Sequence, residues 1–379
     1  MVFLDYAATS FHKPPSVRRA VLDALHECAS PGRGGYAAAQ AAEAHVFAAR
    51  RALASLYGVS PEAVSFTYNA TSALNMAIKG LAGSGKIALS GYEHNAAARP
   101  AFALRGAQGC TIAESALFDP EDFVRAFERA LVPGTSLAVC CHVSNVFGQI
   151  APLARIDELC WRRGVPLVVD CAQSAGLLIP DVSALRAAQF LCMPGHKALY
   201  GPQGTGALVH IGTLPVRTLI EGGTGSRSAE LAQPDFEPDR FESGTPNVPG
   251  LAGLAEGIRF AEKERPASLL ARERALSRAA QRELAKLDGV RVYTSPDERQ
   301  QTGVFSFTLD DREAEDAARA LASAGIAVRA GLHCAPLAHK SAGTFPGGTV
   351  RVSPGAFTTP ADMERLLRAV RALRRRSVY

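Results

Sequence analysis

The stretch Val165-Pro166-Leu167-Val168-Val169-Asp170-Cys171-Ala172-Gln173 and the later triplet Gly195-His196-Lys197 decide the fold. The first stretch is an apolar run that ends in a carboxylate, which is typical of a buried strand in a parallel sheet. A second apolar run, Ala188–Met193, ends shortly before Lys197. Because the carboxyl ends of adjacent parallel strands form one crevice, we expect Asp170 and Lys197 to share a site.

An aspartate and a lysine in this order suit a pyridoxal phosphate site. The lysine would hold the aldehyde as a Schiff base, and the aspartate would keep the pyridine nitrogen protonated, so that the ring draws electrons from a bound amino acid. Taken alone, each of the two segments also has a simpler interpretation. Val165–Asp170 would be a core strand whose aspartate caps the next turn, and Gly195-His196-Lys197 would be an exposed turn. Their order and spacing favour the cofactor site.

Length and composition set limits that agree with this prediction. The 379 residues suggest two or three domains, and a hydrophobic content of 47% is ample for a large core. The 41 basic and 36 acidic side chains leave a formal charge of +5, which is too small to indicate a nucleic-acid partner. The composition therefore favours chemistry on a small molecule.

Eight cysteines are scattered along the chain without a C-x-x-C pair, so we expect neither a metal centre nor a disulfide framework. Most lie in apolar runs, where a free cysteine behaves as a small hydrophobic residue, and together they indicate a reducing compartment. No run approaches the ~20 apolar residues of a membrane span. We therefore expect a cytoplasmic protein with no membrane segment.

Short apolar runs alternate with longer helical stretches, which is typical of an α/β protein with a mostly parallel sheet. The predicted strands are Val64–Thr67, Ile87–Leu89, Ser136–His142, Val165–Asp170, Gln189–Met193 and Gly206–Ile211. A helix is predicted over Ser72–Leu81, so Asn69-Ala70-Thr71 lies at its N-terminus, where free amides and the helix dipole favour a phosphate. An ordinary N-cap without a ligand explains this segment equally well.

The pattern changes after Pro249, where a helix-rich stretch over Leu251–Leu287 precedes a compact αβ region. Its predicted elements are strand Val304–Leu309, helix Glu313–Ala324, strand Ile326–Arg329, strand Thr349–Ser353 and helix Pro360–Arg374. This second region looks like a smaller domain. We expect a large cofactor-binding domain over residues 15–250 and a small domain formed by residues 1–14 and 251–379.

Eight motifs follow one another along the chain. They are Leu4-Asp5-Tyr6-Ala7-Ala8-Thr9-Ser10, Asn69-Ala70-Thr71, Glu93-His94-Asn95, His142-Val143-Ser144-Asn145, Asp170-Cys171-Ala172-Gln173, Gly195-His196-Lys197, Phe241-Glu242-Ser243-Gly244-Thr245-Pro246-Asn247 and His333-Cys334-Ala335. In this order they closely resemble the class V aminotransferase group of fold-type I pyridoxal phosphate enzymes, in particular the cysteine desulfurases. The resemblance implies a large domain with a mostly parallel seven-stranded sheet and a smaller α+β C-terminal domain.

The same resemblance implies roles around the cofactor ring. Lys197 would form the Schiff base and, once freed by substrate, move the Cα proton as general base and acid. Asp170 would pair with the pyridinium nitrogen, and Gln173 would hydrogen-bond the phenolate oxygen. His94 would stack on the ring face, although a lone histidine is more often a structural residue.

The cofactor phosphate would be held by the amide of Ala70, by Thr71 and by His196. The resemblance further implies that Thr245 of the partner subunit reaches this phosphate, so that a homodimer completes the active site.

On the substrate side, Asn145 would lie near the substrate carboxylate and a cofactor oxygen. Arg351 would clamp the carboxylate, a bidentate task that suits a guanidinium, and Arg329 is a second candidate for substrate binding. Without the resemblance, Arg351 would be interpreted as a surface strand arginine.

Cys334 would decide the reaction. In a desulfurase the thiolate of this residue attacks the sulfur of L-cysteine, leaving L-alanine and an enzyme persulfide for sulfur metabolism such as iron–sulfur cluster assembly. Attack requires the thiolate, so a neighbouring cation should favour ionisation, and Arg329 and His333 are close in sequence. Any one of eight cysteines is more often structural, but the surroundings of Cys334 have the sequence of a loop.

Only 16 residues lie between Cys334 and Arg351. This spacing resembles the short-loop, sulfur-mobilisation type, in which a dedicated acceptor protein must approach the persulfide. Three positions depart from that type. Pro194 replaces a hydroxyl residue, while Tyr36 and Leu332 each stand where a histidine is usual.

Two classes of function stay open. The first is an enzyme: a cysteine desulfurase, with selenocysteine lyase, cysteine sulfinate desulfinase or another class V aminotransferase as alternatives. The second is a non-catalytic scaffold that binds pyridoxal phosphate. The joint presence of Lys197, Asp170, His94, Arg351 and Cys334 favours the enzyme, because a structural role requires no such set.

Overall fold

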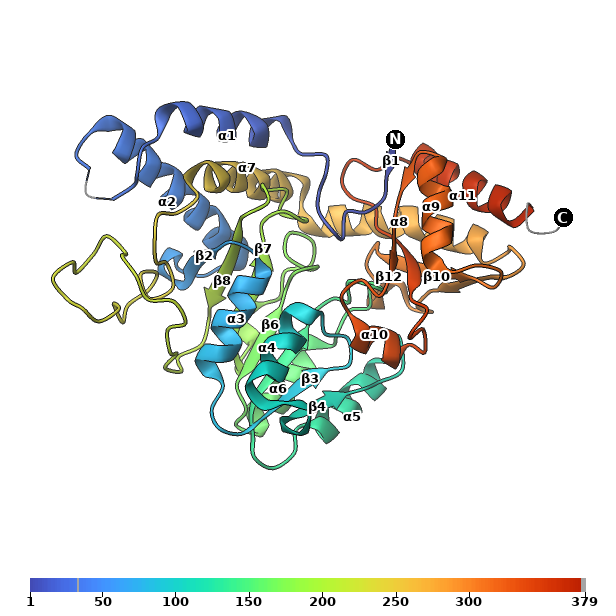
Figure 1. The fold of residues 1–379 in the computed structure, drawn as a ribbon, viewed down its shortest axis with the longest axis horizontal. Coiled ribbons are helices and arrows are strands. Elements are labelled where there is room, and N and C mark those ends of the chain that lie inside the picture. The colour runs from blue at the N-terminus through green and yellow to red at the C-terminus, as the bar shows by residue number, and fades with distance from the viewer. Residues whose placement is uncertain (33, 376–379) are drawn as a thin grey trace.

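The computed structural model describes residues 1–32 and 34–375. The chain forms a large α/β unit and a smaller unit beside it (Figure 1). Strand β1 (Val2–Phe3) and the last helix, α11 (Pro360–Arg375), both lie in the smaller unit. Within the described residues, no helix combines the length and apolar character that crossing a membrane requires.

The large unit is built on a seven-stranded sheet in the order β2-β8-β7-β6-β5-β3-β4. Its strands are β2 (Val64–Thr67), β3 (Lys86–Ser90), β4 (Cys110–Ala113), β5 (Thr135–Cys141), β6 (Leu167–Asp170), β7 (Ala188–Pro194) and β8 (Gly206–His210). Strand β8 runs antiparallel to both of its neighbours, and the other pairs are parallel. The predicted mostly parallel seven-stranded sheet is confirmed. Strand β4 was not predicted, because it is a short, half-exposed edge strand with little apolar signal.

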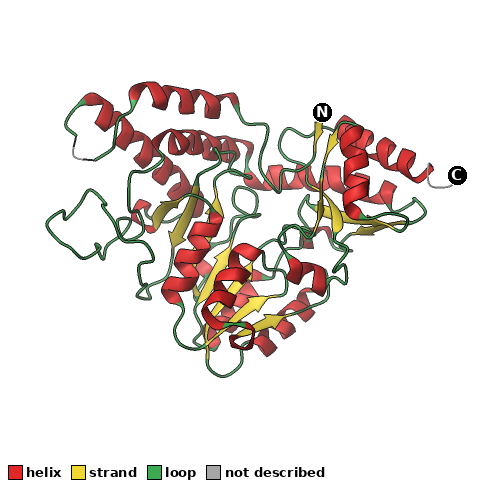
Figure 2. Cartoon of the chain, viewed as in Figure 1, coloured by secondary structure: helices red, strands yellow, loops and turns green. Residues whose placement is uncertain are grey.

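The central strands are buried on both faces. Val168 and Val169 are both fully buried, yet they belong to different hydrophobic clusters, since successive side chains of a strand point to opposite faces. Helices α3 (Ala70–Leu81) and α4 (Asn95–Arg105) contribute to one cluster. The other cluster draws on α2 (Ala37–Tyr57), α5 (Pro120–Ala130), α6 (Leu153–Arg162) and α7 (Val248–Glu264). Figure 2 shows these helix layers around the sheet.

The smaller unit contains a four-stranded antiparallel sheet in the order β12-β13-β10-β9. Its elements are α8 (Pro266–Leu284), β9 (Val290–Tyr293), β10 (Phe305–Leu309), α9 (Ala314–Ser323), β11 (Ile326–Ala327), β12 (Arg329–Gly331), α10 (Pro336–Ser341) and β13 (Thr349–Val352), followed by α11. The single strand predicted over 326–329 was wrong. Strand β11 pairs with β1, whereas β12 pairs with β13, so the chain changes partner at Val328.

Helix α7 begins at the predicted domain boundary, packs against α1 (Pro15–Glu27) and α2, and is followed by α8, which packs against α11. The division at residue 250 stays a prediction. The 3-10 turns Pro61–Ala63, Ala107–Gly109, Val182–Ala184 and Glu298–Gln300 complete the regular structure. Residues 211–247, between β8 and α7, form a long segment without helix or strand that extends away from the sheet (Figure 2).

Candidate active site

A cavity of about 540 Å³ is lined by residues of both units. Its wall contains every predicted site residue except Thr245: Ala70, Thr71, His94, Asn145, Asp170, Gln173, His196, Lys197, Arg329, Cys334 and Arg351. Thr245 is exposed on the loop before α7. One chain thus gathers nearly the whole predicted set in a single concave site, which is the usual form of a small-molecule pocket.

Asp170 and Lys197 enter this cavity from neighbouring strands. Asp170 is the last residue of β6 and lies opposite Cys141 of β5 and Cys192 of β7 in the strand register. Its Oδ1 accepts a hydrogen bond of 2.8 Å from the amide of Ala172, and burial raises its pKa. Lys197 follows the end of β7, and burial lowers its pKa to about 8 although the charge of Asp170 opposes this shift.

The N-terminus of α3 forms another part of the wall. Asn69 caps this helix, and its Oδ1 accepts a hydrogen bond of 2.9 Å from the amide of Ser72. Ala70 and Thr71 are the first two helical residues, whose amides have no partner inside a helix and favour an anion. The helix begins two residues earlier than predicted, so these residues belong to its first turn.

His196 lies beside this helix end in the cavity wall. Its Nδ1 and the hydroxyl of Thr9 are 3.1 Å apart, and burial lowers its pKa to about 4. Pro194, which departs from the related motif, ends β7 and also lines the cavity. It offers neither a hydroxyl nor an amide donor.

His94 is the N-cap of α4, and its Nδ1 accepts a hydrogen bond of 3.0 Å from the amide of Ala96. Because Nδ1 is an acceptor, the proton of the neutral ring lies on Nε2. Burial, together with nearby positive charges, lowers the pKa of His94 to about 4. The ring is therefore neutral at neutral pH, which suits stacking against an aromatic ligand.

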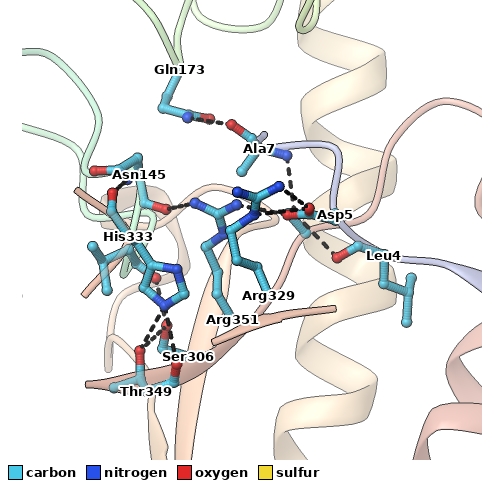
Figure 3. Close-up of polar contacts among 12 residues, drawn as sticks. Leu4, Asp5, Ala7, Asn145, Gln173, Ser306, Arg329, His333, Thr349 and Arg351 are labelled. Carbon is cyan, nitrogen blue, oxygen red and sulfur yellow. Dashed lines mark hydrogen bonds and ion pairs between the residues drawn. The ribbon is translucent and has the colours of Figure 1, made fainter. Parts of the chain in front are cut away.

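Arg351 is buried at the small-unit side of the cavity, where two hydrogen bonds hold its guanidinium (Figure 3). Its Nη2 donates to Oδ1 of Asp5 at 2.7 Å, and its Nη1 donates to the carbonyl oxygen of Asn145 at 3.0 Å. The second oxygen of Asp5 accepts a hydrogen bond of 3.0 Å from Nε of Arg329. The Nε of Arg351 is buried without a partner among the described residues. Arg351 is thus not the surface arginine that its strand alone would suggest.

Cys334 lies on a loop that enters the cavity between β12 and α10. Its carbonyl oxygen accepts from the amide of Asn95, and the carbonyl oxygen of His333 accepts from Nδ2 of Asn145. His333 and Cys334 have φ angles of 49° and 55°, the left-handed conformation that non-glycine residues rarely adopt. Cys334 is exposed and lines the cavity together with Arg351.

His333 does not supply the cation that the sequence suggested for Cys334. Its ring is buried, its Nε2–H donates to the carbonyl oxygen of Thr349 at 3.1 Å (Figure 3), and burial lowers its pKa well below the usual value. A neutral ring gives no positive charge to a thiolate. Arg329 and Arg351 are cations that line the same cavity as Cys334.

Two residues of the site were quoted in the sequence motifs without a role. Asp5 joins the two arginines, and Glu93 is fully buried where strands β3 and β5 end. One oxygen of Glu93 accepts from the amide of Cys141 at 2.5 Å and from the hydroxyl of Ser90 at 2.6 Å. The only sequence signal for either was a carboxylate placed beside other motif residues.

The residues of the cavity fit pyridoxal phosphate by their chemistry. A helix N-terminus offers donors to a phosphate, Asp170 is a buried carboxylate suited to a protonated ring nitrogen, and Lys197 has an amine whose neutral form is accessible near neutral pH. The buried Oδ1 of Asn145 has no partner among the described residues and is available to a ligand.

Comparisons with known proteins agree on one family. Residues 2–366 match the family model described as aminotransferase class-V. A probable cysteine desulfurase of Mycolicibacterium paratuberculosis is 31% identical over 389 residues, covering 98% of this chain and 55% of that protein. A probable cysteine desulfurase of Methanothermobacter thermautotrophicus is 30% identical over 382 residues, covering 96% of this chain and 92% of that protein. The apo structure of a cysteine desulfurase from Thermococcus onnurineus NA1 has a TM-score of 0.88 and 29% identity, covering 99% of this chain and 94% of that one. The chain thus spans little more than half of the first relative and most of the other two.

Proposed function

Because the chain belongs to the class-V aminotransferase family, as its motifs predicted, we propose that it is a pyridoxal-phosphate-dependent cysteine desulfurase. It removes sulfur from L-cysteine and releases L-alanine. The observation that carries this proposal is the single cavity in which Lys197, Asp170, Arg351 and Cys334 meet. Bound pyridoxal phosphate would supply the electron-withdrawing ring that the chemistry requires.

Six groups would hold the cofactor in this proposal. The first-turn amides of α3 would bind the phosphate together with Thr71 and His196, and the buried carboxylate of Asp170 would pair with the ring nitrogen. Gln173 lies on the cavity wall with its Nε2 donating to the carbonyl oxygen of Ala7 at 2.9 Å. The second N–H of this amide would donate to the phenolate oxygen of the cofactor, and the neutral ring of His94 would pack on the cofactor ring.

Arg351 binds the carboxylate of L-cysteine through the edge that carries its unpartnered Nε, since its other two nitrogens are already engaged. Asn145 donates one N–H of its Nδ2 to the carbonyl oxygen of His333, and its second N–H would donate to the substrate carboxylate or a cofactor oxygen. The neutral amine of Lys197 takes the Cα proton, and the same group returns a proton to the product. A pKa of about 8 suits both directions near neutral pH.

Cys334 takes the sulfur in this proposal. Its thiolate attacks the substrate sulfur, so that a sulfur–sulfur bond forms while the carbon–sulfur bond breaks. The electron pair of the broken bond stays with the substrate carbon, which gains a proton and leaves as alanine. The hydrogen bonds to the carbonyl oxygens of His333 and Cys334 hold the loop and thereby fix the direction of attack.

A homodimer and a sulfur acceptor belong to the same proposal. Thr245 is exposed and absent from the cavity wall of its own chain, as expected if it serves the partner subunit. Tyr68, next to the capping Asn69, is also an exposed aromatic residue that a partner would cover. The exposed Cys334 sits on a short loop, so an acceptor protein must approach it. Sulfide release at full rate without any acceptor would refute that requirement.

The test compares the native chain with Cys334→Ala, measuring sulfide and alanine from L-cysteine and the absorbance of the lysine-bound cofactor. Loss of both products with unchanged absorbance supports the nucleophilic cysteine. Undiminished activity in Cys334→Ala indicates a lyase or transaminase instead. If Lys197→Ala keeps the absorbance, the cofactor assignment is wrong. Selenocysteine, cysteine sulfinate and a keto-acid acceptor of amino groups are assayed in parallel to separate the alternatives.

A further inference from the structure

Asp5 lies between the two arginines of the cavity and contacts each with a different oxygen (Figure 3). Oδ1 accepts from Nη2 of Arg351 at 2.7 Å, and Oδ2 is 3.0 Å from both Nε and Nη2 of Arg329. Within the described residues, Asp5 is the only carboxylate that forms an ion pair with either guanidinium. Two positive groups therefore share one negative group.

The backbone of Asp5 is fixed by the same strand that carries Arg351. The amide of Tyr6 donates to the carbonyl oxygen of Ser353 at 3.1 Å, and the amide of Ser353 donates to the carbonyl oxygen of Leu4 at 2.8 Å. The hydroxyl of Ser353 accepts from the amide of Ala7 at 3.0 Å. Since Ser353 lies two residues beyond Arg351, main-chain and side-chain contacts hold Asp5 to one short length of chain. Its carboxylate consequently has little freedom to move.

The charges explain what this carboxylate does. Arg351 and Arg329 repel each other, as the lowering influence of Arg329 on the pKa of Arg351 indicates, although burial is the larger cause. Asp5 offsets this repulsion and leaves one net positive charge for the pair. The Nε of Arg351, which has no hydrogen-bond partner among the described residues, is then held in a fixed direction and can donate to an anion.

We propose that Asp5 is the positioning residue of the substrate-carboxylate site: it orients Arg351 and Arg329 so that they bind the α-carboxylate of an amino acid. The proposal rests on the proposed function for the role of Arg351. Asp5 itself does not touch the substrate. We therefore expect substitution of Asp5 to weaken the binding of ligands that have a carboxylate and to leave the binding of amines without one unchanged.

The experiment uses the enzyme reconstituted with pyridoxal phosphate and two ligands, L-alanine and ethylamine, which differ in the carboxylate. Binding is followed by cofactor absorbance in the native chain, Asp5→Asn and Asp5→Ala. We expect Asp5→Asn to weaken L-alanine binding about tenfold, a loss of ~1.4 kcal/mol, and to leave ethylamine binding within about twofold. The KM for L-cysteine should rise by a similar factor, with a smaller change in kcat.

Asp310→Asn is the matched control, because it removes an exposed ion pair with Arg374 in the same unit and should leave both ligands unaffected. In an Arg351→Gln background, Asp5→Asn should cause a smaller further loss of L-alanine binding, because Asp5 then orients only Arg329. Unchanged L-alanine binding in Asp5→Asn overturns the proposal, and so does an equal loss for both ligands, which would mean a general structural role. Asp5→Asn keeps an acceptor oxygen, so it decides the question if Asp5→Ala does not fold.

The two proposals fail in different ways. A native enzyme that binds L-alanine but releases no sulfide from L-cysteine refutes the desulfurase and leaves the role of Asp5 to the binding data. A native enzyme that desulfurates L-cysteine while Asp5→Asn binds L-alanine normally refutes only the role of Asp5.

Discussion

The amide of Asn95 donates a hydrogen bond of 2.7 Å to the carbonyl oxygen of Cys334. This bond joins the loop of the exposed thiol to the N-terminus of α4, directly after His94. A second bond, from Nδ2 of Asn145 to the carbonyl oxygen of His333, holds the same loop at 2.9 Å. The thiol is therefore accessible while its backbone is fixed from two elements of the large unit, which is the arrangement a positioned nucleophile requires.

Accessibility predicts selective labelling of the thiols. Cys334 is the exposed cysteine, whereas Cys28 and Cys110 are partly buried and the other five are buried. We expect iodoacetamide to modify one thiol per native chain rapidly, and Cys334→Ala to lose this fast phase. Cys28→Ala is the control and should retain it. A fast-reacting thiol in Cys334→Ala, located by mass spectrometry, would contradict the prediction.

The φ angle of 55° at Cys334 predicts an unusual order of stability among its variants. Alanine pays the steric cost of the left-handed conformation, whereas glycine adopts it freely but gains more entropy in the unfolded chain. We expect Cys334→Gly to be more stable than Cys334→Ala by roughly 0.5–1 kcal/mol. Urea unfolding of the two apo variants measures this difference. A more stable alanine variant would show that the loop relaxes out of this conformation.

The meeting of Asp170 and Lys197 could be predicted from the sequence, because each follows a buried apolar run and such runs form adjacent parallel strands. The pairing of β6 with β7 confirms that step. The seven-stranded sheet followed from the resemblance. Thr71 could be placed at a helix N-terminus because the strand and helix signals adjoin.

Other relationships leave no local trace in a sequence. Asp5 and Arg351 are 346 positions apart, and a single carboxylate near the start of a chain has no periodicity that names its partner. The same holds for α7, whose apolar face indicates burial but not that α1 and α2 cover it. The change of partner between β11 and β12 depends on β1 reaching the smaller unit, which only the tertiary fold determines.

The pKa of Lys197 predicts how pH governs cofactor incorporation. Burial lowers this pKa from the ordinary 10.5 to about 8, and the neutral amine is the nucleophile toward the aldehyde. We expect the rate of pyridoxal phosphate incorporation into the apo protein to rise up to about pH 8 and then level off. Stopped-flow absorbance measures it, with Lys197→Arg as the inactive control. A rate that keeps rising toward pH 10.5 would mean an ordinary, solvated lysine.

Glu93 predicts a pH dependence of stability. Burial, with the nearby charge of Asp170, raises its pKa from 4.5 to about 8, so the folded chain binds more protons than the unfolded chain between these values. Its contribution to stability is complete below pH 4.5 and is lost as pH rises through 8. Glu93→Gln keeps one side-chain oxygen that can accept both hydrogen bonds, and its amide cannot ionise.

We therefore expect the Tm of apo Glu93→Gln, relative to that of the native chain, to increase steadily from about pH 5 to about pH 8. Differential scanning calorimetry at matched ionic strength measures the two series. Glu128→Gln, at an exposed surface position, should show a constant difference. A constant difference for Glu93→Gln as well would mean that Glu93 is already ionised in the folded chain.

The loop that carries Thr245 depends on a partly buried ion pair. Glu242 accepts hydrogen bonds from Nη1 and Nη2 of Arg50 at 2.9 and 2.8 Å, and from the amide of Phe66 at 2.6 Å. The side chain of Arg50 is 9% exposed and that of Glu242 is 19% exposed. Removal of one member of such a pair leaves the other charge buried without compensation.

We expect Glu242→Ala to lower the free energy of unfolding by about 3 kcal/mol. The control is Glu121→Ala, which removes a similar two-bond contact with Arg155 at an exposed site and should lower the free energy of unfolding far less. Urea unfolding of the apo proteins measures both. Since Glu242 anchors the segment leading to Thr245, Glu242→Ala should also weaken the proposed homodimer, which analytical ultracentrifugation measures. Equal losses of unfolding free energy in the two variants would mean that burial does not strengthen the Arg50 contact. If Glu242→Ala leaves the proposed homodimer unaffected, Glu242 does not support the subunit interface.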